Sequence, residues 1–202
     1  MFDFFHHFDA LFKQLLFNLP FLLKFIAVIW VVYIVNILLK GRLNILGIYP
    51  RHPFGLLGVL FAPFLHASWA HLIMNSLMLL ILGMMVLLYG KPIFIAVSVL
   101  TMLYSGLGIW LLGRKSLHIG ASALVMGYFG FLLVEAYYRP NLITIIVAAV
   151  CVFFFSGLFV NLFPQDKKTS WEGHVIGFIS GIAAVYSYSW FLPYLQHVWP
   201  LV

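Results

Sequence analysis

Apolar residues form six long stretches along the chain, and charged residues, prolines or glycines bound each of them. A stretch of about 20 apolar residues is long enough to cross a bilayer as an α-helix. Proline and glycine at the boundaries are typical of helix starts and stops. The pattern therefore predicts six membrane-spanning helices, at about residues 19–39, 70–90, 92–113, 120–138, 140–163 and 173–195.

Two segments fall outside this pattern. Residues 41–68 are apolar, but prolines and glycines interrupt them, which predicts a loop or a shallow re-entrant segment between the first two spans. In residues 1–18, apolar positions recur at helical spacing with polar residues between them, as in a helix that lies in the membrane interface. We therefore expect an amphipathic interfacial segment at 1–18 and a membrane domain at 19–202.

The composition changes the class of protein that has to be considered. Hydrophobic residues make up 64% of the chain and charged residues 8%, against roughly 25% charged residues in an ordinary soluble domain. This excludes a soluble fold, a disordered chain, a disulfide scaffold and a nucleic-acid-binding module. The net charge of +6 is best explained by basic anchors at the membrane surface. The sequence predicts an all-α polytopic protein embedded in the lipid bilayer.

Three polar clusters lie at the beginnings of the second, fourth and sixth predicted spans. Polar groups inside a membrane are costly, so each cluster is a functional candidate. Because successive helices alternate in direction, these three beginnings share one face of the membrane, close to the water that a hydrolytic reaction consumes. The clusters contain His66, His71 and Asn75, then Gly120, Ala121 and Ser122, then His174, Gly177 and Gly181.

Small residues predict which helices pack together. Gly177 and Gly181 are four residues apart, as are Ala123 and Gly127. Such faces allow two membrane helices to approach closely. If the fourth and sixth spans pack through them, the His174 side chain comes within reach of the Ser122 hydroxyl.

The residue types then indicate nucleophilic chemistry. A serine hydroxyl is a weak nucleophile until a base takes its proton, and histidine titrates in the useful range. Backbone N–H groups near Ser122, such as that of Ala121, are available to an oxyanion because they open a helix. His71 and Asn75 lie four residues apart on one helix face and add side-chain donors. No carboxylate is placed to orient His174, so we predict a Ser–His dyad.

The clusters together resemble the rhomboid intramembrane serine proteases. His66-x4-His71-x3-Asn75 is similar to the family's H-x4-H-x3-N signature on the second helix. Gly120-Ala-Ser122-Ala123 is similar to its G-x-S-G on the fourth helix, and His174-x2-Gly177-x3-Gly181 to its H-x2-G-x3-G on the sixth. The resemblance covers nearly the whole chain and is closest to the compact bacterial type. It implies a six-helix bundle with a membrane-associated first loop, in a bacterial cytoplasmic membrane.

The resemblance also implies roles for individual residues. Ser122 would be the nucleophile and His174 the general base, His71 and Asn75 would line the oxyanion hole, and His66 would support the first loop. The family uses no cofactor and cleaves membrane-anchored protein substrates. The chain departs from the family pattern at Ala123, where glycine is usual, and lacks the Trp-Arg pair of the first loop.

Alternative functions stay open at this point. The alanine at position 123 favours a catalytically silent rhomboid-like protein that binds transmembrane helices. The histidines would also suit a proton path in a small channel or transporter. A metal site at His66, His71 and His174 is not predicted, because it lacks an acidic or cysteine ligand. His118 is interpreted as a loop residue near the site.

The membrane orientation stays open as well. The resemblance implies a cytoplasmic N-terminus and a site that faces outward. The positive-inside rule favours the reverse. With a cytoplasmic N-terminus, the cytoplasmic side would carry Lys13, Lys24, Lys91 and Arg139, and the opposite side Lys40, Arg42, Arg51, Arg114, Lys115, Lys167 and Lys168.

Overall fold

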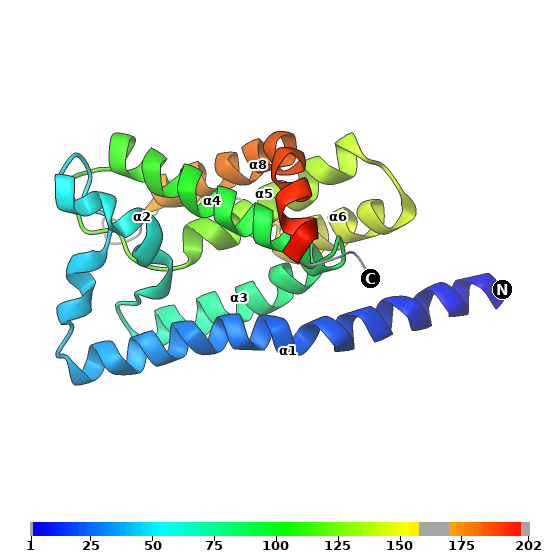
Figure 1. The fold of residues 1–202 in the computed structure, drawn as a ribbon, viewed down its shortest axis with the longest axis horizontal. Coiled ribbons are helices and arrows are strands. Elements are labelled where there is room, and N and C mark those ends of the chain that lie inside the picture. The colour runs from blue at the N-terminus through cyan, green and yellow to red at the C-terminus, as the bar shows by residue number, and fades with distance from the viewer. Residues whose placement is uncertain (1, 158–169, 199–202) are drawn as a thin grey trace.

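The computed structural model describes residues 2–157 and 170–198 as a bundle of helices (Figure 1). Within these ranges no strand forms, and Ile48 and His118 make an isolated antiparallel bridge. The all-α prediction is therefore confirmed. The long helices are α1 (Phe2–Leu38), α3 (Trp69–Leu87), α4 (Lys91–Leu112), α5 (Ser122–Tyr138), α6 (Leu142–Phe155) and α8 (Trp171–Val198).

Several of these helices can cross a membrane. Parts of α1, α3, α4 and α8 are long and apolar enough for this, while α5 and α6 are apolar but shorter. The chain is therefore an integral membrane protein, as its composition predicts. Residues 158–163 of the fifth predicted span and the basic residues Lys167 and Lys168 lie outside the described residues.

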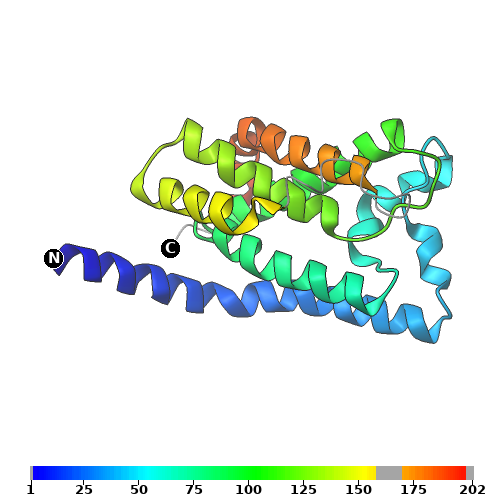
Figure 2. The ribbon, with the colours of Figure 1, turned by 180° about the vertical axis from the view of Figure 1, so that it is seen from behind.

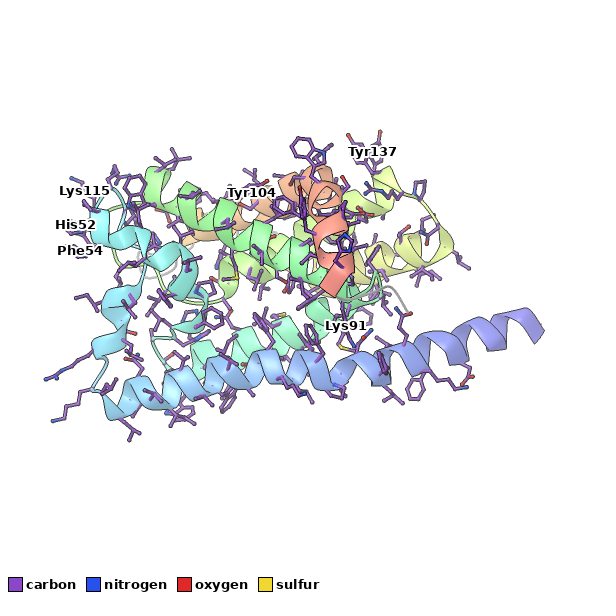
Figure 3. All side chains as sticks on the ribbon, in the orientation of Figure 1. His52, Phe54, Lys91, Tyr104, Lys115 and Tyr137 are labelled. Atoms are coloured by element: carbon purple, nitrogen blue, oxygen red, sulfur yellow. The ribbon has the colours of Figure 1, made fainter. Side chains whose placement is uncertain are left out.

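The helices α3, α5 and α8 begin at the same end of the molecule, where residues 41–68 also lie (Figures 1 and 2). The alternating helix directions predict this arrangement. Labelled side chains mark the two ends in Figure 3, with His52 and Lys115 at the end where these helices begin and Tyr137 at the other. The three polar clusters of the sequence are thereby placed at one end of the bundle.

Helix α1 continues through the expected boundary at residue 18 without a break, with Pro20 inside it. Its 37 residues give a length of about 55 Å at 1.5 Å per residue, well beyond a hydrocarbon core of about 30 Å. The Gln14 and Asn18 amides donate to the carbonyl oxygens of Leu88 and Leu87, at 3.0 and 3.4 Å. Those residues end α3, so the part of α1 before Gln14 extends past it (Figure 1). The side chains of residues 1–8, 10 and 11 lie outside the description.

Residues 41–68 form a folded loop that packs on the end of α4. The Arg51 guanidinium donates to the Leu111 carbonyl oxygen at 2.9 Å, and the Trp110 indole donates to the His52 carbonyl oxygen at 2.9 Å. A Cβ on Gly106 of α4 would lie 2.8 Å from Val59 Cα. The loop contains the short helices η1 (Arg42–Leu46), η2 (Pro53–Leu56), α2 (Gly58–Phe61) and η3 (Ala62–Phe64).

Helices α5 and α8 approach through glycines. A Cβ on Gly177 would collide with the Ala123 backbone, and a Cβ on Gly181 with the Gly127 carbonyl oxygen. Further along α5, a Cβ on Gly130 would collide with the Phe178 carbonyl oxygen. The predicted packing through small residues is confirmed, and it brings the beginnings of the two helices together.

A buried carboxylate joins the same helices at their other end. Glu135 of α5 is 2% exposed. It accepts a hydrogen bond from Arg139 at 2.8 Å and from the Tyr188 hydroxyl of α8 at 3.0 Å. The contact between α5 and α8 is therefore fixed at both ends.

Replacing Gly181 by alanine is expected to lower the free energy of unfolding in detergent by at least about 1–3 kcal/mol, the usual cost of overpacking. The added methyl would have to displace the backbone of α5. Gly157→Ala is the matched control, because no atom of the described chain lies within 4 Å of that Cβ position. Equal stability of the two variants would show that the close approach is not needed.

Candidate active site

A cavity of about 680 Å³ opens where α3, α4, α5 and α8 meet the folded loop. Its lining includes His71 and Asn75 from α3, Ser122 from α5 and His174 from α8. The structure therefore brings members of all three sequence clusters to one place. A serine, two histidines and an asparagine from three helices line this one cavity.

Ser122 is the first residue of α5 and is partly exposed. Ala121 is at the N-cap position, where no side chain caps the helix. The first N–H groups of a helix lack intrahelical partners, and the helix dipole adds positive potential there. The beginning of α5 can therefore stabilise negative charge beside the Ser122 hydroxyl.

Gly120 brings the backbone before Ser122 against the polar side chains of α3. Its φ of +117° favours glycine. A Cβ there would collide with the His71 ring and lie 3.5 Å from Asn75 Nδ2. The Gly120 N–H donates to the Ala62 carbonyl oxygen at 2.9 Å, which ties this turn to the folded loop. Only glycine allows the turn and α3 to meet this closely.

The two polar residues of α3 are held by different means. Ser68 caps the helix and accepts a hydrogen bond from the His71 backbone N–H at 3.2 Å. Asn75 is 7% exposed, and its Nδ2 finds no hydrogen-bond partner within the described chain. A buried donor without a partner costs about 1–3 kcal/mol. Its place in the cavity lining makes it available to an acceptor that enters the cavity.

His66 does not line the cavity and lies behind His71. Its ring is 5.0 Å from the His71 ring, centroid to centroid, in an edge-on arrangement. It is 1% exposed. Burial, and then the neighbouring His71, lower the pKa of His66 to about 4. The buried His66 ring packs against His71, and the support of the first loop that the resemblance implies for His66 stays a prediction.

The carboxylate nearest to His174 in sequence faces another partner. Glu172 Oε1 lies 3.5 Å from Arg114 Nε in an ion pair. This ion pair joins the first turn of α8 to the segment that follows α4. No group of three His, Cys, Asp or Glu side chains in the described ranges is arranged to hold a metal ion.

The departure at Ala123 is accommodated by packing. Ala123 packs against a small apolar cluster of Ile48, Ala62 and Ile109, as do Trp110 and Ile176. The methyl group therefore fills apolar space beside the cavity.

Sequence reasoning missed one contact at the edge of the cavity. His118 Nδ1 lies 2.7 Å from Ser170 Oγ, and both residues line the cavity. Ser170 was not a candidate, although serine directly before a helix is a common capping residue. The contact joins the two turns that precede Ser122 and His174.

Comparison with known proteins agrees with the motifs. A family model described as Rhomboid domain matches residues 53–191, more than half of the chain. Uncharacterized proteins of Mycobacterium bovis and Mycobacterium tuberculosis are each 36% identical over 174 residues, which cover 82% of this chain and 72% of theirs. An uncharacterized protein of Mycobacterium leprae is 34% identical over 174 residues, covering 82% of this chain and 69% of its own.

Burial of His66 predicts a loss of stability in acid. The native pKa of about 4 is below the unfolded value of about 6.5, so the unfolded state binds protons more readily between these values. The free energy of unfolding therefore has its highest value above pH 6.5, as far as His66 determines it. It falls by about 3 kcal/mol towards pH 4. Burial also lowers the pKa of His118, which adds to the same trend.

Denaturant unfolding in detergent at several pH values measures this effect. The variant His66→Phe is expected to lose stability less steeply with falling pH. Replacing the exposed His52 by phenylalanine is the control and should keep the steep dependence. The assignment to His66 fails if both variants follow the wild-type curve.

Proposed function

The chain belongs to the rhomboid family, and we propose that it is an intramembrane serine endopeptidase that acts through Ser122 and His174. One observation carries the proposal. The Ser122 and His174 side chains line the same cavity as His71 and the unpartnered Asn75 amide, although these four residues come from three different helices. The substrates are membrane-anchored proteins cut within or beside their transmembrane segments. No cofactor takes part.

The reaction begins with His174 accepting the proton of Ser122 Oγ as that oxygen attacks the scissile carbonyl carbon. The resulting oxyanion accepts hydrogen bonds from Asn75 Nδ2, from the His71 ring and from backbone N–H groups at Ala121 and Ser122. The C–N bond then breaks, His174 donates its proton to the leaving amine, and an acyl group stays on Ser122. Water, deprotonated by His174, releases the acid and restores the serine.

The cavity suits a reaction that consumes water. It lies at the end of the bundle where α3, α5 and α8 begin, next to the folded loop. Its polar side chains are within a turn or two of those helix starts, so water reaches them without crossing the membrane. Ala123 packs against an apolar cluster, so the departure from glycine at this position is compatible with the proposed reaction.

The proposed topology has six crossings in a bacterial cytoplasmic membrane. The shorter helices α5 and α6 cross as well as the four longer ones, which keeps the beginnings of α3, α5 and α8 on one side. Residues 1–18 lie in the membrane interface, and 19–202 form the membrane domain. The 37 residues of α1 exceed a single crossing by about 25 Å, so part of this helix lies beyond the hydrocarbon core.

Replacing Ser122 by alanine is expected to abolish cleavage of a single-span test substrate in detergent and to abolish labelling by a fluorophosphonate probe. The reason is loss of the attacking oxygen. Ser187→Ala is the matched control, because Ser187 lies near the middle of α8 and its hydroxyl bonds to the Ala183 carbonyl oxygen. Labelling that persists in Ser122→Ala would remove Ser122 as the nucleophile.

Replacing Asn75 by alanine is expected to lower kcat by about 10²–10³-fold, the usual effect of removing an oxyanion donor, with KM little changed. Steady-state kinetics on the same substrate measure this split. Ser76→Ala serves as control, since the Ser76 hydroxyl accepts a hydrogen bond from Trp30 of α1 at 2.9 Å. An unchanged kcat in Asn75→Ala would exclude this amide from the oxyanion hole.

A further inference from the structure

His118 joins several segments at the edge of the cavity. Its Nδ1 lies 2.7 Å from Ser170 Oγ, and its Nε2 lies 3.0 Å from the Arg114 carbonyl oxygen. Its backbone pairs in both directions with Ile48 of the folded loop, at 2.8 and 3.0 Å. The residue is 6% exposed. His118 is therefore held firmly by groups that come before and after it in the chain.

These contacts fix the tautomer of the ring. A carbonyl oxygen only accepts hydrogen bonds, so Nε2 must carry the proton that is donated to Arg114. In the neutral ring Nδ1 is then an acceptor, and the Ser170 hydroxyl must donate to it. Burial lowers the pKa of His118, which keeps the ring neutral. The bond between Ser170 and His118 therefore has a defined direction.

Ser170 holds the first turn of α8. Its carbonyl oxygen accepts hydrogen bonds from the Gly173 and His174 backbone N–H groups, at 3.1 and 3.4 Å. A Cβ on Gly173 would lie 3.2 Å from Ser170 Oγ. The position of Ser170 therefore sets where α8 begins and how its first turn is rotated.

The hydrogen bond between His118 and Ser170 lies the same number of residues before Ser122 as before His174. His118 is four residues before Ser122, and Ser170 is four residues before His174. Gly177, three residues after His174, meets the backbone of Ala123, the residue directly after Ser122. A hydrogen bond before the pair and a glycine contact after it thus constrain both helix starts. Shifts of about 1 Å at a reacting pair can cost about 100-fold in rate.

We infer that His118 and Ser170 are positioning residues, whose hydrogen bond sets the register between Ser122 and His174. The inference rests on the proposed function, because the relative position of Ser122 and His174 matters for the reaction proposed there. It concerns the alignment of the two helix starts and involves no contact with substrate.

Kinetics of the detergent-purified full chain test the inference. Ser170→Ala and His118→Ala should each lower kcat by about tenfold, with KM within twofold, and Ser170→Thr should keep kcat because it retains the hydroxyl. The double variant should be no worse than either single variant, because both remove one bond. Ser116→Ala is the control, since Ser116 Oγ lies 3.3 Å from Nε2 on the other side of the ring.

Amide hydrogen exchange tests the same inference without any proteolysis. His118→Ala should speed exchange of the His174 amide on α8 about tenfold, and Ser170→Ala should do the same for the Val125 amide, which donates to Ala121 on α5. Losses of kcat that multiply in the double variant, or exchange that changes only on the mutated side, would overturn the inference. A wild-type protein without protease activity would defeat the proposed function alone, and the exchange result would still decide whether the two starts are coupled.

Discussion

The close approach of α5 and α8 is the contact on which the site depends. Gly177 and Gly181 of α8 meet the backbone of α5 at Ala123 and Gly127, where no Cβ would fit. Lipid tails are as apolar as leucine side chains, so helices in a membrane associate through close packing and hydrogen bonds more than through burial of apolar area. This approach brings Ser122, at the beginning of α5, and His174, in the first turn of α8, to one shared cavity.

Glycine has a second use at Gly120, where the left-handed backbone brings the beginning of α5 against His71 and Asn75. Helices α3, α5 and α8 therefore line one cavity, together with the N-terminus of α5 and the unpartnered amide of Asn75. The packing of the three helices places these groups around the cavity. Donors that need no rearrangement stabilise a developing charge most effectively.

The sequence predicts the helical class, the positions of most helices and the common face of the polar clusters, because hydropathy and alternating direction depend only on the order of residues. It predicts the packing of α5 on α8 because small residues recur at helical spacing. It does not predict the short helices within residues 41–68 or the bond between His118 and Ser170, which are 52 residues apart. Those features depend on loop conformations, which no periodic pattern encodes.

An experimental structure of the protein after reaction with a fluorophosphonate would test the account most directly. The proposed mechanism predicts phosphorus bonded to Ser122 Oγ, with the His174 ring beside it and a phosphoryl oxygen about 3 Å from Asn75 Nδ2. An adduct on another residue, or a phosphoryl oxygen directed away from both α3 side chains, would contradict it.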